Sequence, residues 1–316
     1  MDKVAVLIPC YNESLTIEKV VNDIRIALPD AIVYVYDNNS DDGTDDIARS
    51  AGAIVRYEYK QGKGHVIRRM LREIDANCYF LIDGDDTYPI DNMHDMANKI
   101  LCGKVDMVIA DRLSSTYFSE NKRPFHNIGN IIVRKLINFL FKSNIVDIMT
   151  GYRAFNYLFA KTFSVLSAGF EIETEMTIHA IDKNMQVESI AINYRNRPEG
   201  SMSKLNTYSD GLKVIKTIFS LFKNYRPLHF FGYIALILTL ISISVFIPSI
   251  LIPYARTGQV ANFPTLIVIG FTVIAALLSF YSGMILSTIR QKNKQDYEFN
   301  LRYIYDKYKH INGNNE

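Results

Sequence analysis

The sequence predicts an α/β domain with a mostly parallel β-sheet flanked by helices, followed by an amphipathic interfacial helix and two transmembrane helices. Three observations support this fold class. In the first hundred residues, short apolar runs alternate with amphipathic stretches, as in repeated β-α units. Polar clusters follow several of these runs. After residue 226, two uncharged segments each exceed the roughly 20 residues that a helix needs to cross a bilayer.

Each predicted strand is a short apolar run that ends in a polar or glycine-containing turn. The first, Lys3–Ile8, precedes a helix for which Ser14 is a suitable N-cap. The later strands are Ile32–Tyr36, Ile54–Tyr59, the run that ends at Asp83, and Met107–Ala110. Helices are predicted between them, and the last two of these are His65–Ile74 and Asp91–Leu101.

Beyond Arg112 the pattern changes to longer helices and isolated loops. The expected elements are a helix over Arg123–Phe141, a loop or strand start over Thr150–Phe155 (TGYRAF), a helix opening in Phe170–Glu175 (FEIETE), a strand over Val187–Arg195 and a basic loop over Arg197–Lys204 (RPEGSMSK). The segment Tyr208–Phe222 has an apolar face opposite its lysines, so we expect it to lie in the membrane interface. Packing of this helix on the soluble domain is the alternative.

The two uncharged segments, Pro227–Ala255 and Thr257–Ile289, are apolar on all faces, which disfavours a hairpin buried in a soluble protein. Basic residues flank the pair at both ends and only Arg256 lies between, so the positive-inside rule predicts a cell-membrane protein with both termini in the cytoplasm. No secretory signal is evident, and three widely spaced cysteines fit reduced thiols in a cytosolic domain. The predicted organisation is a cytoplasmic domain at 1–207, an amphipathic helix at 208–226, a transmembrane hairpin at 227–289 and a cytoplasmic tail at 290–316.

The stretch Phe80–Pro89 (FLIDGDDTYP) carries the clearest chemical signal. A buried strand that ends in Asp83 and Asp85 brings two carboxylates to a solvent-facing edge, where a divalent cation would relieve their repulsion. Oxygen ligands are those that Mg²⁺ and Mn²⁺ prefer. Gly84 lets a bulky ligand approach the backbone. An Asp-rich turn formed for conformational reasons alone is the alternative.

Three more polar clusters follow predicted strands: Pro9–Glu13, Asp37–Thr44 and Asp111–Arg112. Open α/β sheets bind ligands at the carboxyl ends of their strands, so four clusters would converge on one edge. No Gly-x-Gly-x-x-Gly follows the first strand, and we therefore expect no dinucleotide redox cofactor. The net charge of +2 says little about partners. We expect no nucleic-acid partner.

Three stretches in this order, PCYNE (9–13), DNNSDDGT (37–44) and DGD (83–85), resemble glycosyltransferase family 2 enzymes with the Rossmann-like GT-A fold. Further matches at Arg112, TGYRAF, FEIETE and RPEGSMSK look like the branch of dolichyl-phosphate mannose synthase and bacterial polyprenyl-phosphate glycosyltransferases. The resemblance extends over residues 1–225. The membrane part is similar in the number and position of its spans.

The resemblance implies a role for each matching residue. The nucleotide-sugar site would be lined by Pro9, Tyr11, Asn12, Glu13, Asp37, Asn39, Lys63, Asp83 and Gly84, with Asp37 near the base or ribose. Asp83 and Asp85 would hold Mg²⁺ or Mn²⁺, Asp85 more directly, and would be catalytic together with Arg112. Asp86 and Thr87 stand where relatives often carry Leu and then Gln or Ser, so the third metal ligand is undefined.

The basic residues of the second half suit a lipid phosphate as the acceptor. A phosphate monoester has a second pKa near 6, so it is anionic at neutral pH and needs no general base. It needs cationic positioning, for which the candidates are Arg112, Arg123, Arg134, Arg197 and Lys204. A hydroxyl acceptor would instead need a base such as Glu171, Glu173 or Glu175, although acidic residues also suit the first turn of a helix. His65, His126 and His179 show no metal-ligand spacing, and we expect structural or exposed positions for them.

The leading hypothesis is an inverting, membrane-anchored glycosyltransferase that moves a sugar from a nucleotide donor to polyprenyl phosphate at the cytoplasmic face. A UDP-linked donor is expected by analogy with bacterial relatives. The first alternative keeps the fold but transfers sugar to a hydroxyl of a lipid-linked or growing glycan. The second is a non-catalytic membrane protein that binds nucleotide sugar. The donor sugar, the choice of metal and any homo-oligomer stay open.

Overall fold

The computed structural model of the chain describes residues 1–114, 134–139, 141–165, 169, 171–193, 195, 219–220, 222–260 and 262–313. These fall into two compact units. The first unit comprises residues 1–211 together with 298–316, and the second comprises residues 212–297. The first unit holds all of the strands and the predicted site residues.

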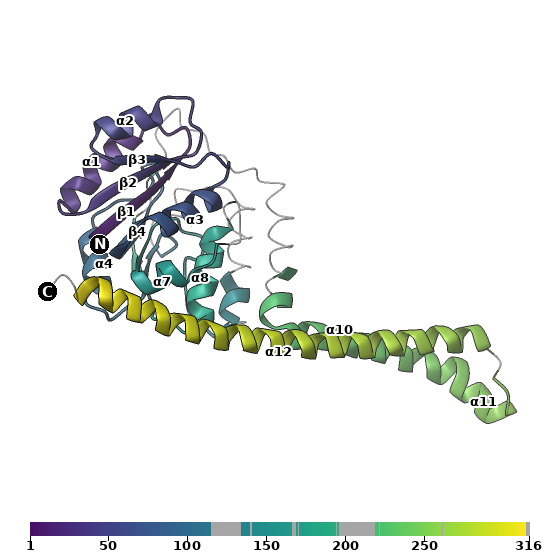
Figure 1. Ribbon diagram of the computed structural model, residues 1–316. Helices are drawn as coiled ribbons and strands as arrows, with labels where there is room; N and C mark the ends of the chain where they lie inside the picture. Colours follow the sequence, from purple (N-terminus) through teal and green to yellow (C-terminus); the bar gives the residue numbers. More distant parts are fainter. Residues whose placement is uncertain are drawn as a thin grey trace. The chain divides into compact units, whose positions relative to one another are not determined.

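A seven-stranded sheet in the order β3-β2-β1-β4-β6-β5-β7 forms the centre of the first unit (Figure 1). Its strands are β1 (Asp2–Cys10), β2 (Ile32–Asp37), β3 (Ile54–Tyr57), β4 (Ala76–Leu81), β5 (Met107–Asp111), β6 (Arg153–Asn156) and β7 (Val187–Ala191). β6 runs antiparallel to both of its neighbours, and the other neighbouring pairs are parallel. The carboxyl ends of β1, β2 and β4 therefore meet at one edge of the sheet.

Helices cover both faces of this sheet (Figure 1). They are α1 (Ile17–Ala27), α2 (Thr44–Ser50), α3 (Lys63–Glu73), α4 (Met93–Leu101), α7 (Tyr157–Thr162) and α8 (Ile172–Asp182). Successive side chains of a strand point to opposite faces. In β1, the alternate residues Val4, Val6 and Ile8 join one buried cluster with residues of α1, α2 and α4. The fully buried Ala5 and Leu7 between them face the side of α3, α7 and α8.

This architecture confirms the predicted fold class. The strands expected before Arg112 are present, and α8 begins in FEIETE as expected. TGYRAF is a loop followed by a strand start, as expected: its last three residues begin β6, whose antiparallel direction the apolar pattern did not predict. Of the predicted helix Arg123–Phe141, residues 134–139 and 141 are described and are helical. The loop Arg197–Lys204 lies outside the described residues.

The second unit contains the apolar helices. They are α10 (Pro227–Phe246), a π-helical turn η1 (Ile247–Leu251), α11 (Ile252–Thr257) and most of α12 (Phe263–Gly313). Two stretches, Pro227–Thr257 and Phe263–Ile311, are long and apolar enough to cross a membrane. The predicted interfacial helix Tyr208–Phe222 lies almost wholly outside the described residues, so its position stays a prediction.

The end of α12 packs within the first unit. The Tyr308 hydroxyl donates a hydrogen bond to Asn77 Oδ1 at 2.9 Å, and the Tyr308 ring lies 5.0 Å from that of Tyr157, centroid to centroid. Asn77 belongs to β4, whose opposite end leads to Asp83. The segment 290–316, expected as a tail, is thus helical as far as Gly313, and its Tyr308 contacts the strand that precedes Asp83 and Asp85.

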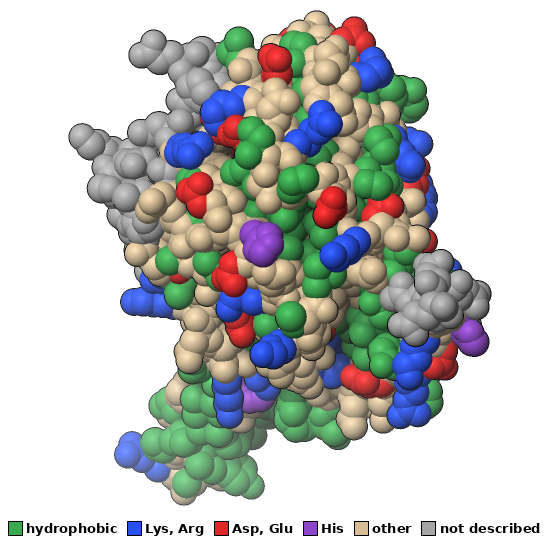
Figure 2. Space-filling view, turned by 90° about the vertical axis from the view of Figure 1, so that its left-hand side faces the viewer, with side chains coloured by type: hydrophobic (Ala, Val, Ile, Leu, Met, Phe, Trp, Pro, Cys, Tyr) green, Lys and Arg blue, Asp and Glu red, His purple; other side chains and the backbone are tan. Residues whose placement is uncertain are grey.

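The surface carries charges of both signs. Figure 2 shows Lys and Arg side chains interspersed with Asp and Glu over the face that it presents. Exposed pairs such as Lys19–Asp23 join residues one turn apart on the same helix. Such pairs contribute little to stability, so the functionally informative charges are the buried ones at the sheet edge.

Candidate functional site

The loops after β1 and β2 are tied together at the carboxyl edge of the sheet. Cys10 and Asp37 are partners in the β1–β2 register, so both strands end at the same level. The Asn12 amide donates to Ser40 Oγ and the Glu13 amide to Thr44 Oγ1, both at 2.9 Å. These hydrogen bonds bring together, at one rim of the sheet, the residues of both loops that are predicted to bind the nucleotide sugar.

Asp37 places a buried carboxylate in this rim. It is 3% exposed, and its Oδ2 accepts the Ser40 amide at 2.9 Å. Its buried Oδ1 has no hydrogen-bond partner among the described residues. Buried polar atoms are normally paired, so this oxygen is available to accept an N–H or O–H from a ligand.

Asn38 and Asn39 connect the same loop to the chain after β3. The Asn38 amide group donates to the Glu58 and Lys60 carbonyls, and its Oδ1 accepts the Gly62 amide at 2.8 Å. Asn39 donates to the Tyr59 carbonyl at 3.0 Å. These contacts fix the start of α3, whose first residue is Lys63. Asn38, which sequence reasoning did not single out, is the more buried of the two.

The three aspartates after β4 have different surroundings. Asp83 Oδ1 lies 2.5 Å from Lys63 Nζ. Asp85 is 5% exposed, and its Oδ1 accepts the Thr87 hydroxyl at 2.7 Å. Asp86 has a φ of +54° and pairs with Lys19 of α1 at 2.8 Å. Asp86 therefore pairs with α1, and Asp83 and Asp85 remain the candidate metal ligands.

Two glycines allow close packing at the site. A Cβ on Gly84 would lie 2.9 Å from Cys10 Sγ. A Cβ on Gly151, in the TGYRAF stretch, would collide with the Asp83 carboxylate. Only glycine lets these two segments approach so closely.

Lys63 lies between two carboxylates. Its Nζ is 2.5 Å from Asp83 Oδ1 and 2.6 Å from Glu173 Oε1 of α8. Burial alone lowers the pKa of Lys63, but the negative charges of Asp83 and Glu173 outweigh it and raise the pKa above its ordinary value. Burial raises the pKa of Glu173, and Lys63 opposes that rise. Of the three FEIETE glutamates, Glu173 is the one that the structure brings to the predicted site.

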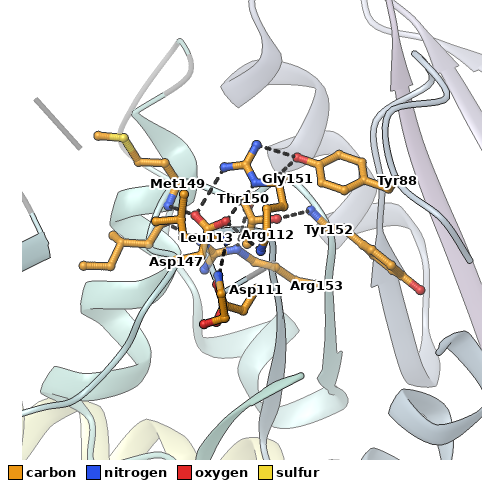
Figure 3. A network of polar contacts seen from close by, with 12 residues as sticks. Tyr88, Asp111, Arg112, Leu113, Asp147, Met149, Thr150, Gly151, Tyr152 and Arg153 are labelled. Atoms are coloured by element: carbon orange, nitrogen blue, oxygen red, sulfur yellow. Dashed lines mark hydrogen bonds and ion pairs between the residues drawn. The ribbon is translucent and has the colours of Figure 1, made fainter. Parts of the chain in front are cut away.

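Arg112 is held by a network of polar contacts with Asp147 and Tyr88 (Figure 3). Its guanidinium binds the fully buried Asp147 with two N–H groups, at 2.8 and 3.2 Å. It also donates to the Tyr88 hydroxyl at 3.3 Å, and the same hydroxyl accepts the Gly151 amide at 3.0 Å. Gly151 in turn lies against Asp83. Sequence reasoning assigned no role to either partner: Tyr88 lies within FLIDGDDTYP but was not singled out, and Asp147 lies outside every quoted stretch.

Arg153 of the TGYRAF stretch is fully buried and has a structural setting (Figure 3). It donates to the Thr150 and Ile148 carbonyls and to the Thr177 hydroxyl of α8, at 3.0, 2.6 and 2.7 Å. Burial lowers the pKa of Arg153 to about 10. This side chain fixes the loop that carries Gly151.

The donor atoms at the end of β4 fit a divalent cation. Asp83 and Asp85 supply carboxylate oxygens at one edge, and the Lys63 ammonium already occupies one of them as a cation. Within the described ranges, no group of three or more His, Cys, Asp or Glu side chains is arranged to hold a metal. Two protein ligands suffice for Mg²⁺, which commonly keeps waters and shares substrate phosphates.

Some of the remaining predicted residues are described by the structure and others are not. Arg134 is half-buried on the helical segment 134–139, while Arg123, Arg197 and Lys204 lie outside the described residues. His179 packs edge-on against Phe159 and Phe163, and burial lowers its pKa to about 4. A neutral imidazole packed against two aromatic rings indicates a structural role for His179.

Several known proteins are similar to this chain in sequence. The family model of glycosyl transferase family 2 matches residues 5–162. Glycosyltransferase AglJ of Haloferax volcanii is 29% identical over 297 residues, covering 93% of this chain and 97% of that protein. The dolichyl-phosphate hexose transferase of the same organism is 28% identical over 217 residues, covering 69% of this chain and 92% of that protein.

Solved structures share the fold. The glucosyl-3-phosphoglycerate synthase of Mycobacterium tuberculosis, crystallised with Mn²⁺, UDP-glucose and phosphoglyceric acid, superposes with a TM-score of 0.54 at 21% identity. The match covers 70% of this chain and 79% of that chain.

Proposed function

The chain belongs to glycosyl transferase family 2 and is a glycosyltransferase, and from this premise we propose that it transfers one sugar from a UDP-linked donor to polyprenyl phosphate. The product is a polyprenyl-phosphate sugar with inverted anomeric configuration. Membership of the family sets aside the non-catalytic alternative.

The observation that carries the proposed acceptor is the link from Arg112 to Asp83. The Arg112 guanidinium contacts Tyr88, Tyr88 contacts Gly151, and Gly151 lies against the Asp83 carboxylate. We expect this carboxylate to lie near the leaving diphosphate. Planar guanidinium groups suit phosphate oxygens. The similarity to a protein named dolichyl-phosphate hexose transferase supports a lipid phosphate as their ligand.

The donor would bind along the rim formed by the loops after β1 and β2. The open Oδ1 of Asp37 suits an N–H of the base or an O–H of the ribose. Lys63, at the start of α3, suits the diphosphate because it is a compact positive charge beside Asp83. The related fold crystallised with UDP-glucose supports a uridine nucleotide.

The chemistry is a single displacement at the anomeric carbon. The bond between this carbon and the donor phosphate oxygen breaks, and its electron pair leaves with the nucleoside diphosphate. A phosphate oxygen of the lipid forms the new bond from the opposite face, and no proton must be removed from a dianionic phosphate monoester. The protein's task is to align the two reactants and hold their charges.

Asp83 and Asp85 would hold Mg²⁺ or Mn²⁺, and the cation, when bound, would offset the negative charge that develops on the leaving diphosphate. Lys63 contributes a further positive charge from the protein itself.

The membrane anchor fits this substrate. A polyprenyl phosphate presents its phosphate at the bilayer surface, and the two apolar stretches would keep the enzyme there. Residues 298–316 belong to the same compact unit as residues 1–211, which supports an even number of spans with both termini on one side. The positive-inside pattern gives that side as the cytoplasm of the cell membrane.

A hydroxyl acceptor is the alternative, with Glu173 as its general base. The ion pair between Glu173 and Lys63 disfavours this role, because a base must be able to take a proton from the acceptor.

Nucleoside diphosphate release tests the proposal. Purified protein in detergent would be given a panel of UDP- and GDP-sugars with Mg²⁺ or Mn²⁺, with and without undecaprenyl phosphate. Release that needs both the metal and the lipid phosphate supports the proposal and identifies the donor. Release that needs a saccharide and ignores the lipid phosphate contradicts it.

A further inference from the structure

Lys63 is shared by two carboxylates that come from different parts of the fold. Asp83 follows β4, Glu173 lies in the first turn of α8, and Lys63 opens α3. The two N–O distances, 2.5 and 2.6 Å, show that the ammonium is bound equally closely to both. The proposed donor site thus contains a cation with two anchors.

The two anchors differ in their access to solvent. The Asp83 side chain is 25% exposed, whereas those of Lys63 and Glu173 are 9% and 5% exposed. A divalent cation arriving from solvent therefore meets Asp83 before it meets Glu173. Lys63 pairs with Asp83 Oδ1, and the proposed metal would bind the same carboxylate.

The arrival of the metal creates a conflict at Asp83. A divalent cation and an ammonium repel each other, and in a partly buried site that repulsion is screened less than in water. Lys63 has a flexible four-carbon stem, so without a second anchor it would either compete with the metal for Asp83 or move away into solvent.

We propose that Glu173 is a positioning residue that retains Lys63 at the donor site when Asp83 binds the divalent cation. The inference rests on the proposed nucleotide-sugar site and is independent of the acceptor. The ion pair between Glu173 and Lys63 would persist when the metal binds Asp83. The negative charge of Glu173 would also add to the attraction for the divalent cation. Lys63 would then remain available to bind the donor diphosphate beside the metal held by Asp83 and Asp85.

If the ion pair between α3 and α8 had only a structural role, variants of Lys63 and Glu173 would behave differently. Replacing a buried ion pair by apolar residues of similar size is often neutral for stability, while removing one partner is strongly destabilising. A structural pair would therefore be replaceable by two methionines without functional loss. A positioning pair would regain stability in that double variant but not ligand binding.

The experiment uses the full chain in detergent and measures binding without any acceptor. Mn²⁺ affinity is followed by electron paramagnetic resonance and UDP affinity by calorimetry, for the wild type, Glu173→Gln, Glu173→Asp and Lys63→Met/Glu173→Met. Glu171→Gln is the matched control, because Glu171 loses the same charge from the start of the same helix but is exposed.

We expect Glu173→Gln to weaken Mn²⁺ binding roughly 10- to 100-fold, the usual range for a group that orients a metal ligand. UDP binding in the presence of Mn²⁺ weakens as well, Glu173→Asp recovers part of both, and Glu171→Gln matches the wild type. The Met/Met variant has wild-type thermal stability but weak UDP binding.

Wild-type Mn²⁺ and UDP affinity in Glu173→Gln would overturn the inference. If Glu173→Gln does not fold, the Met/Met variant decides, because wild-type UDP binding there leaves only a structural role. Failure of lipid-phosphate transfer alone would not affect these measurements, so the two proposals fail separately.

Discussion

Replacing Gly151 by Ala places a methyl group against the Asp83 carboxylate. Cβ would collide with Oδ2 and would lie 2.9 Å from the carboxyl carbon and 3.0 Å from Oδ1. Ordinary contacts between such atoms are longer by several tenths of an ångström, so the carboxylate must move. Lys63 holds Oδ1 at 2.5 Å and resists that movement.

The consequences can be estimated for both stability and activity. Overpacking of this kind costs about 1–3 kcal/mol of unfolding free energy. A displacement of about 1 Å at a reacting centre can lower turnover by about 100-fold. We expect Gly151→Ala to remain folded but to lose about that factor in kcat/KM, with weaker Mn²⁺ binding.

The assay is nucleoside diphosphate release at several Mn²⁺ concentrations, with thermal unfolding measured on the same samples. Gly270→Ala is a suitable control, since a Cβ there meets nothing within 4 Å. Unchanged turnover and Mn²⁺ affinity in Gly151→Ala would refute the placement of Asp83 at the reacting centre.

Three further predictions follow from buried contacts. Asp147→Asn leaves the Arg112 guanidinium without its carboxylate, so it should cost about 3–5 kcal/mol of stability and remove acceptor-dependent turnover. Urea unfolding measures the stability and product analysis measures the turnover. Because burial lowers the pKa of His179 to about 4, the unfolded chain binds more protons below pH 6.5, so stability falls by up to about 3 kcal/mol as the pH drops towards 4. A His179→Gln variant should lose that slope in unfolding curves at several pH values. Tyr308→Phe removes the hydrogen bond to Asn77 and should cost about 1 kcal/mol, whereas the exposed Tyr305→Phe should leave the melting temperature unchanged.

The sequence predicts the parts of the site that local patterns encode. The runs that become β1, β2 and β4 are apolar, and each is followed by a polar cluster (PCYNE, DNNSDDGT or DGD) that must leave the sheet at its carboxyl edge. Parallel strands place these clusters together whatever the details of packing. The convergence of Asn12, Asp37 and Asp83 on one edge could therefore be predicted.

Contacts between distant residues could not be predicted in the same way. Glu173 lies 110 positions from Lys63, and Asp147 lies 35 positions from Arg112. Nothing in FEIETE distinguishes the glutamate that turns inward, because the helix phase is set by packing against the sheet. The hydrogen bond between Tyr308 and Asn77 spans 231 positions and depends on the helix that follows the second apolar stretch.

The direction of β6 escaped prediction for a related reason. A four-residue strand buried on both sides has no alternation to indicate its neighbours. The antiparallel strand nevertheless brings Gly151 to Asp83, and the buried Arg153 holds the preceding loop in place.

The measurement that tests the proposed reaction most directly is ³¹P nuclear magnetic resonance of the lipid product over a range of pH. A phosphate monoester titrates with a pKa near 6, whereas a phosphodiester has no such ionisation. If the sugar is transferred to polyprenyl phosphate, the lipid phosphorus signal loses its pH dependence around neutrality as nucleoside diphosphate is released, and Asp85→Asn prevents the change. A lipid phosphate that keeps titrating near pH 6 while nucleoside diphosphate accumulates would contradict the account.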